Sequence, residues 1–197
     1  MLKTKKFPAF LACLMAAALA GCDTGEADPA QGGEEVSSET GVEEFTGTLD
    51  RTFAGEAIPA VMLSDPAGIT MELADSGDRP ILLNLWATWC APCVVEMPLL
   101  DALAGELGED VRVLTVSEDL SGADAVVPFF EERGFTNLPR WMDPNNDLAI
   151  AFGGGAVLPL TVLYNADGKE VWRVIGSYDW GSEEARVLVQ EALADDG

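Results

Sequence analysis

Apolar runs alternate with polar and glycine-containing segments from residue 45 onward, and this alternation predicts a folded domain of strands and helices. The runs at 81–86 and 111–116 are typical of buried strands. Two pairs of shorter runs flank turns rich in Asp, Asn, Pro and Gly and predict two β-hairpins; the pairs are 60–63 with 69–73, and 160–164 with 170–174.

Helical patterns occupy the segments between these strands. Residues 123–133 are amphipathic, with Gly134 as the helix end and with Val126, Val127, Phe129 and Phe130 on the inward face. The other predicted elements are a helix at about 92–107, a short strand at 138–141, a helix at about 146–152 before the glycine loop 153–155, and a closing helix at 182–193 with Ser182 as N-cap. This order predicts an α/β fold in which helices cover both faces of a mixed sheet.

The first 21 residues have the pattern of a secretory signal. Lys3, Lys5 and Lys6 precede an apolar segment at 7–20, which is too short for a membrane span. The segment ends in Leu-Ala-Gly-Cys, which resembles the lipobox of bacterial lipoproteins and implies cleavage before Cys22 and lipidation of this cysteine. An ordinary signal peptide followed by a chance cysteine is the alternative.

An acidic segment separates Cys22 from the predicted domain. Residues 23–44 contain eight Asp or Glu and no Lys or Arg. This composition cannot bury enough apolar surface to offset the entropy of ordering, so residues 22–44 are expected to be a lipidated cysteine and a disordered tether. With the secretory signal and the lipobox, this segment predicts a protein of the cell envelope that faces the periplasm. Asp23 resembles the signal that keeps lipoproteins on the inner membrane in enterobacteria, so the inner membrane is the expected site. Residues 45–197 then form one domain, expected to be a monomer.

The net charge excludes one class of partner. The chain has 11 Lys or Arg against 34 Asp or Glu, a formal charge of −23, and loss of residues 1–21 with their three lysines takes it to −26. Phosphate contacts need cationic side chains, so nucleic-acid binding is excluded. Anionic lipid headgroups would repel the same surface, which leaves the lipid on Cys22 as the expected membrane attachment.

Cys90 and Cys93 stand where the first buried strand gives way to a helix. Cys90 would lie at the helix N-terminus, where free backbone N–H groups and the helix dipole favour the thiolate. Cys93, one turn inside, can close a disulfide with Cys90. The pair therefore predicts thiol–disulfide exchange, in which Cys90 attacks a client disulfide and Cys93 resolves the mixed disulfide.

Other uses of a cysteine pair fit the sequence less well. A zinc site needs four ligands, and the sequence has no histidine and no further cysteine beyond Cys22. Covalent haem attachment needs a histidine directly after the second cysteine, where Val94 stands. A purely structural disulfide stays open as the alternative to redox chemistry.

The segment WATWCAPC, followed by Glu96 and Pro98, resembles the TlpA and ResA group of membrane-anchored thiol:disulfide reductases in the thioredoxin superfamily. The resemblance covers the chain from about residue 53 to residue 195. It implies a thioredoxin-like fold with an extra N-terminal β-hairpin. Three further segments carry it: 55–59 at the entry to that hairpin, 158–161 at a cis-proline loop, and GSYDW at 176–180.

The resemblance also implies the residues that meet a client protein. The Leu158–Pro159 peptide bond is expected to be cis, with Pro159 against the cysteine pair and the backbone before it free to pair with an extended client strand. The remaining client-binding candidates are Trp89, Ala91, Pro92 and Leu158, with Arg140 and Trp141 as weaker candidates for the same surface.

Glu96 matches the family's acidic position, and the resemblance places it in partial burial beneath the cysteines. Desolvation and a nearby thiolate would both raise its pKa, so a protonated Glu96 could exchange a proton with Cys93 or with a departing thiolate. The alternative is a solvated side chain on an exposed helix face.

Single positions separate this chain from neighbouring families. Thioredoxin has a buried aspartate where this chain has Asn84, and a peroxiredoxin has a threonine where it has Ala87. The haem-pathway CcmG type has Gly-Ala-Pro-Glu where residues 157–160 read Val-Leu-Pro-Leu, and the copper-delivering Sco type needs a histidine. The differences favour the TlpA and ResA pattern, with Asn84 as a hydrogen-bonded core residue.

The surroundings of Cys90 in the sequence favour a reducing role. No basic residue lies near it and Glu96 adds an acid, so its thiolate is only modestly stabilised. We expect reduction of disulfides in periplasmic clients for the biogenesis of cytochrome c or of the copper sites of cytochrome oxidase, without a bound cofactor. The resemblance implies a membrane electron donor of the DsbD or CcdA type. The alternative is a chaperone module that binds Cu(I) through Cys90 and Cys93.

Overall fold

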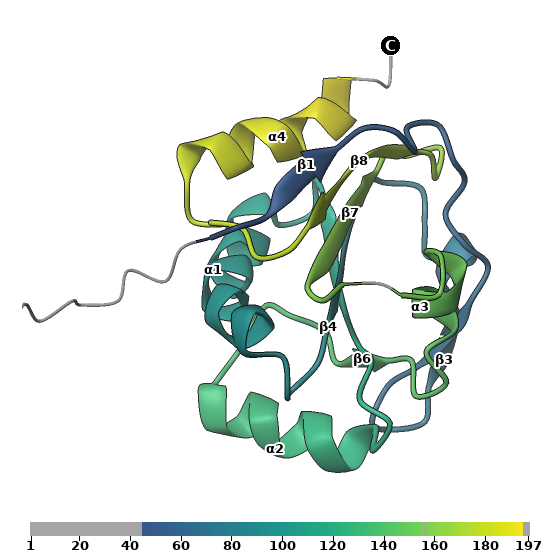
Figure 1. Ribbon diagram of the computed structural model, residues 1–197, viewed down its shortest axis with the longest axis vertical. Helices are drawn as coiled ribbons and strands as arrows, with labels where there is room; N and C mark the ends of the chain where they lie inside the picture. Colours follow the sequence, from purple (N-terminus) through teal and green to yellow (C-terminus); the bar gives the residue numbers. More distant parts are fainter. Residues whose placement is uncertain (1–44, 156, 195–197) are drawn as a thin grey trace, which may run out of the picture. The chain divides into compact units, whose positions relative to one another are not determined.

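The computed structural model describes residues 45–155 and 157–194, and eight strands in these ranges form one mixed β-sheet (Figure 1). The strands are β1 (Thr48–Asp50), β2 (Met62–Ser64), β3 (Thr70–Glu72), β4 (Ile81–Trp86), β5 (Arg112–Ser117), β6 (Trp141–Met142), β7 (Leu160–Tyr164) and β8 (Glu170–Ile175). Their spatial order is β1-β8-β7-β4-β5-β6-β2-β3.

The sheet has a parallel centre and antiparallel flanks. β4 pairs in parallel with β5, and β5 with β6. β7, β8 and β1 follow as antiparallel neighbours on one side, and the β2–β3 hairpin joins the other side through β6. Because β4, β5 and β6 point the same way, their carboxyl ends meet at one edge, and the cysteine pair follows β4 at this edge.

Helices cover both faces of the sheet, as predicted. They are α1 (Ala91–Leu107), α2 (Ala123–Arg133), α3 (Asp147–Ala151) and α4 (Glu183–Ala194), with a 3-10 turn η1 at Leu73–Asp75. α1, α2 and α4 pack on one face and α3 on the other (Figure 1). Right-handed crossovers from β4 to β5 and from β5 to β6 put α1 and α2 on the same face.

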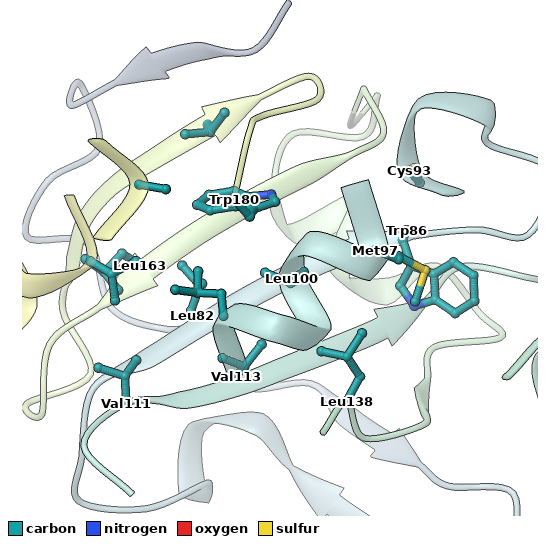
Figure 2. Packing of buried hydrophobic residues seen from close by; sticks show 14 of the residues in the cluster. Leu82, Trp86, Cys93, Met97, Leu100, Val111, Val113, Leu138, Leu163 and Trp180 are labelled. Atoms are coloured by element: carbon teal, nitrogen blue, oxygen red, sulfur yellow. The ribbon is translucent and has the colours of Figure 1, made fainter. Parts of the chain in front are cut away.

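Alternating side chains of the strands divide the core into two halves, one on each face of the sheet. The half that faces α1 includes Leu82, Trp86, Met97, Leu100 and Trp180, each at most 1% exposed (Figure 2). Burial of one large apolar side chain stabilises a fold by about 1.5–3 kcal/mol. The start of α1, where both cysteines lie, is therefore held firmly against the sheet.

Local signals located the helix ends correctly. Gly134 ends α2 in the left-handed conformation with φ 69°, and the N–H of Ala185 donates to Ser182 Oγ at 3.1 Å before α4. On the inward face of α2, Val126 and Phe130 are buried, whereas Val127 and Phe129 are half-buried.

The predictions misplaced the ends of three strands and missed a fourth strand. Residues 138–140 are not a strand, because the N–H of Leu138 donates to Asp101 Oδ1 at 3.2 Å and Pro139 has no N–H. Strands of the first hairpin are shorter than predicted, since the chain turns into η1 at Leu73. Strand β1 was missed because its sequence, Thr-Leu-Asp, has no apolar alternation.

The predicted signal segment 1–21 and the predicted lipidated Cys22 and tether at 22–44 lie outside the described residues. In the part of the chain that the structure does describe, no helix is both long and apolar enough to cross a membrane. Lipid attachment at Cys22 therefore stays a prediction.

Candidate active site at the start of helix α1

A tight turn between β4 and α1 delivers Cys90 to the start of the helix. The N–H of Cys90 donates to the carbonyl of Ala87 at 3.1 Å, which closes the turn over Thr88 and Trp89. Cys90 is the N-cap of α1, and its Sγ accepts a hydrogen bond from the N–H of Cys93 at 3.3 Å. Cys90 and Cys93 are joined by a disulfide bond.

The two sulfurs differ in access. Cys93 is fully buried and Cys90 is 6% exposed, whereas the adjacent Trp89 is 70% exposed. Ala91 and Pro92 are exposed as well, and a helix tolerates proline in its first turn, where backbone N–H groups have no helical acceptor. A client can therefore approach Cys90 but not Cys93, which suits Cys90 as the nucleophile and Cys93 as the resolving thiol.

Glu96 lies inside the domain one helical turn after Cys93 and is 1% exposed. Its Oε1 accepts from Asn84 Nδ2 at 3.0 Å, and its Oε2 accepts from the N–H of Tyr178 at 2.9 Å. Burial raises the pKa of Glu96 to about 7, against the smaller lowering effects of the hydrogen bonds from Tyr178 and Asn84. Burial of Glu96 is thus more complete than predicted, and the solvated alternative is wrong.

Asn84 connects Glu96 to the proline loop. It is fully buried, and its Nδ2 also donates to Thr161 Oγ1 at 3.0 Å. The Leu158–Pro159 bond is cis, as predicted, and Thr161 stands two residues after Pro159 in β7. Pro159 is buried and Leu158 half-buried. The prediction that Asn84 is a hydrogen-bonded core residue is confirmed.

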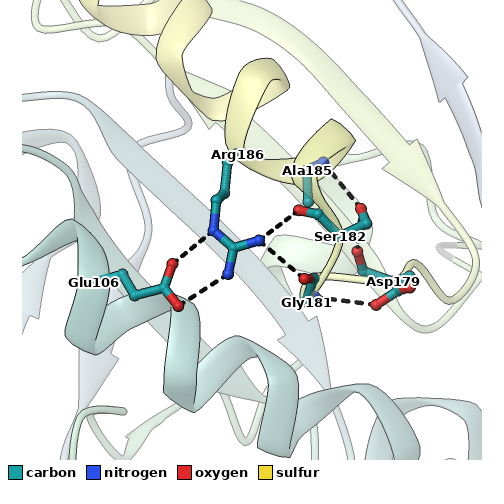
Figure 3. A network of polar contacts seen from close by, with 6 residues as sticks. All are labelled: Glu106, Asp179, Gly181, Ser182, Ala185 and Arg186. Carbon is teal, nitrogen blue, oxygen red and sulfur yellow. Dashed lines mark hydrogen bonds and ion pairs between the residues drawn. The ribbon is translucent and has the colours of Figure 1, made fainter.

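The segment between β8 and α4 supplies the second hydrogen bond to Glu96, through Tyr178. A polar network fastens the end of this segment to the far end of α1 (Figure 3). Arg186 donates to both carboxylate oxygens of Glu106 at 2.7 and 2.9 Å, and to the carbonyls of Gly181 and Ser182 at 2.9 and 3.0 Å. The GSYDW sequence at 176–180 therefore helps to position the buried carboxyl.

Residues 53–188, which contain all of this geometry, match the protein family described as Redoxin. The chain belongs to the Redoxin family. One relative is the thiol-disulfide oxidoreductase ResA of Bacillus thuringiensis, which is 31% identical over 132 residues, 67% of this chain and 75% of that protein. The predicted relationship to the TlpA and ResA group is confirmed.

Solved structures have the same fold. StoA from Bacillus subtilis superimposes with a TM-score of 0.56 at 20% identity, over 70% of this chain and 99% of that one. The pneumococcal exposed lipoprotein thioredoxin from Streptococcus pneumoniae has a TM-score of 0.55 at 26% identity, over 68% and 98% of the two chains. The thioredoxin-like fold is confirmed, and this redoxin is a thiol:disulfide oxidoreductase.

The sequence patterns missed the residues that hold the turn before Cys90. Ser117 and Asp119 are buried where β5 ends, and Asp119 accepts two hydrogen bonds from Thr88. Glu118 between them is also buried, and this burial raises its pKa to about 7. A run of Ser-Glu-Asp directly after a buried strand, at the sheet edge that carries the cysteines, is the signal that could have found them.

Arg140 and Trp141, the weaker client-binding candidates, lie beside the first hairpin turn, and their contact with a client stays a prediction. The Arg140 guanidinium lies 5.3 Å from the centroid of the Phe130 ring. Both residues line a cavity of about 370 Å³ with the hairpin turn at 65–67, and no residue of 87–93 lines it. Among the described residues, no three His, Cys, Asp or Glu side chains are grouped so as to hold a metal ion.

Proposed function

We propose that this redoxin is a lipid-anchored, periplasm-facing reductase of client disulfides, which serves the biogenesis of cytochrome c or of the copper sites of cytochrome oxidase. The surroundings of Cys90 carry the proposal. Cys90 begins α1, and the buried acid Glu96 lies one helical turn after Cys93 in the same helix. None of the described side-chain hydrogen bonds of residues 86–97 involves Lys or Arg.

Weak stabilisation of the Cys90 thiolate favours a reducing role. A helix N-terminus contributes about 0.3–1 kcal/mol, less than one pKa unit, and among the described residues no Lys or Arg side chain hydrogen-bonds to residues 86–97 to add to it. A strong oxidant needs a far more stable thiolate, because its reduced form must be the favoured one. The pair therefore gives electrons to client disulfides and must be recharged, which a membrane donor of the DsbD or CcdA type would do.

The reduction potential tests the direction of electron transfer. Equilibrium of the purified protein with glutathione should give a value near that of thioredoxin, about −270 mV. The protein should also reduce insulin with dithiothreitol as the electron source, and a Cys90→Ser variant should not. A potential near that of the oxidant DsbA, about −120 mV, would contradict the proposal.

Client proteins can be trapped, because Cys93 is the residue that releases them. Cys93→Ser should accumulate mixed disulfides on Cys90 in cells, and mass spectrometry would identify the partners. Apocytochrome c among them would favour the haem pathway, and copper-site proteins the other. Cys90→Ser is the matched control, and equal capture by the two variants would refute the client-reductase proposal.

A Cu(I) chaperone is the second function that these cysteines permit, because thiolates are soft ligands. Titration of the reduced protein with Cu(I), beside the insulin assay, separates the two. Tight Cu(I) binding without insulin reduction would favour the chaperone. The proposed reductase needs no resident cofactor.

The proposed anchor rests on Cys22 and the lipobox-like residues before it. The description of the similar pneumococcal protein as an exposed lipoprotein supports it. Wild type should fractionate with membranes and Cys22→Ser with the soluble periplasm. If both were equally soluble, the anchor proposal would be wrong.

A further inference from the structure

A buried hydrogen-bond cluster lies next to the cysteine turn, and the exchange chemistry described above does not use it. Asp119 is 4% exposed; its Oδ2 accepts from the N–H of Thr88 at 2.9 Å and its Oδ1 from the Thr88 hydroxyl at 2.8 Å. Ser117 Oγ donates to Asp119 Oδ2 at 2.8 Å and accepts from the Asp119 N–H at 3.1 Å. One carboxylate thus binds the backbone N–H and the hydroxyl of Thr88 to the end of β5.

Thr88 matters because of the turn that it occupies. Thr88 and Trp89 are the central residues of the turn that the Cys90 N–H closes on the Ala87 carbonyl. Cys90 is the next residue but one, less than about 8 Å from Thr88 along the backbone. It is also the N-cap of α1, so fixing Thr88 fixes where the nucleophile enters the helix.

The neighbouring acid shows that burial alone does not create this contact. Glu118 is 3% exposed, yet its Oε2 accepts from Asn146 Nδ2 at 2.6 Å. Its N–H extends the β4–β5 ladder to the carbonyl of Trp86 at 2.9 Å, and its side chain accepts no described hydrogen bond from residues 87–93. A buried carboxylate is retained only when it is well hydrogen-bonded, and all three donors to the Asp119 side chain come from Thr88 and Ser117.

We propose that Asp119 is a positioning residue for thiol–disulfide exchange, whose carboxylate holds Thr88 so that Cys90 is presented to Cys93 and to a client sulfur. The inference rests on the oxidoreductase activity of the pair and, for its insulin assay alone, on the proposed reducing function. Two glutathione thiols convert the Cys90–Cys93 disulfide to the dithiol and become oxidised glutathione, a balanced transfer of two electrons and two protons. A well-placed Cys90 favours the closed disulfide, because closure is intramolecular.

Three substitutions and a control test the inference in the otherwise complete protein. Asp119→Ala removes the carboxylate, Thr88→Val removes only the hydroxyl contact, and Thr88→Ser keeps it. Asp143→Ala is the matched control, because Asp143 is equally buried, follows the adjacent strand β6 and accepts from the N–H of Leu148 at 2.7 Å. The two readouts are the equilibrium constant with glutathione and kcat/KM for insulin reduction.

The contact predicts a graded result. Asp119→Ala should shift the glutathione equilibrium about fivefold toward the dithiol and lower kcat/KM for insulin about tenfold. Effects of this size are expected when a buried carboxylate that accepts backbone and hydroxyl hydrogen bonds is lost. Thr88→Val should shift the equilibrium about two- to threefold in the same direction, and Thr88→Ser should match wild type. Asp143→Ala should lower the thermal midpoint and leave the equilibrium unchanged.

Wild-type equilibrium and kcat/KM in a folded Asp119→Ala protein would overturn the inference. An equal shift in Asp143→Ala would also overturn the inference, because the loss of any buried carboxylate that accepts a backbone hydrogen bond would then be enough to shift the equilibrium. If Asp119→Ala does not fold, Thr88→Val and Thr88→Ser decide, and equal values for these two overturn it. The glutathione equilibrium needs no client, so failure of wild type to reduce insulin would count against the proposed function and not against this inference.

Discussion

Two buried glutamates on opposite faces of the sheet have different partners. Glu96 is 1% exposed and Glu170 is 3% exposed. Glu170 accepts from Arg173 at 2.7 and 2.6 Å, and the Arg173 guanidinium stacks 3.7 Å from the centroid of the Phe53 ring. Glu96 accepts hydrogen bonds from the Asn84 amide and the N–H of Tyr178, and the Trp180 side chain also lowers its pKa slightly, so its described partners are all uncharged.

The difference teaches that the partner, not the burial, decides what a buried acid does. The carboxylate of Glu170 is paired with the buried guanidinium of Arg173 on the same strand, β8, and this pairing leaves neither group available for chemistry. A carboxyl without a cation, with a pKa raised to about 7 by burial, can hold or release a proton near neutral pH. Glu170 is therefore structural, whereas we propose that Glu96, which accepts no hydrogen bond from a described Lys or Arg, exchanges protons with the cysteines.

The largest effect should come from breaking the pair on the structural side. Glu170→Gln leaves the Arg173 charge buried without its partner, which should cost about 3–5 kcal/mol of unfolding free energy. Thermal unfolding at pH 7 would measure it, with Glu191→Gln in the exposed pair with Arg51 as the control. A loss below about 1 kcal/mol would show that the two glutamates do not differ as described.

The pH dependence of stability should come from the other glutamate. The pKa of folded Glu96, about 7, exceeds its ordinary value of 4.5, so its stabilising contribution is complete below pH 4.5 and is lost as the pH rises through 7. This shift corresponds to about 3 kcal/mol between pH 4.5 and pH 8. Glu118, with a pKa of about 7, acts with the same sign. Urea unfolding of wild type and Glu96→Gln across this pH range isolates the contribution of Glu96. Equal changes of the unfolding free energy with pH in the two proteins would contradict the prediction.

Proton transfer by Glu96 should have a smaller but more specific effect on the chemistry. Glu96→Gln should slow insulin reduction about tenfold to a hundredfold and change the pH dependence of Cys90 alkylation, because the amide cannot exchange a proton with the thiols. Glu170→Gln is the control and should leave the alkylation profile unchanged. Superimposable alkylation curves for wild type and Glu96→Gln between pH 5 and 10 would refute the role.

The smallest effect should come from the exposed end of the network that positions Tyr178. Glu106 and Arg186 are partly exposed, and solvent screens such pairs, so Glu106→Gln should lower the midpoint of thermal unfolding only slightly. It should leave the alkylation profile of Cys90 unchanged, since Tyr178 is also held by packing against Trp180. A shifted profile would show that this surface pair controls the proton affinity of Glu96.

Local sequence signals predicted the elements well, but not the contacts that close the site. The strand–turn–helix around Cys90 follows from an apolar run and a proline in the first helical turn, and the depth of Glu96 came only from the family resemblance. Its bond to Tyr178 joins residues 82 positions apart, and the Asp119–Thr88 contact spans 31. No local pattern encodes such distances. The wrong strand at 138–140 has the same cause, because a distant Asp101 takes the backbone donor.

The hydrogen bond from Tyr178 to Glu96 also has a consequence for the order in which a newly made chain becomes competent. Ribosomes complete Cys90, Cys93 and Glu96 long before they reach residue 178. The Glu96 carboxyl therefore gains this second hydrogen bond only after β8 and the segment after it have docked, and we expect a chain cut before residue 170 to carry both cysteines without a fixed carboxyl.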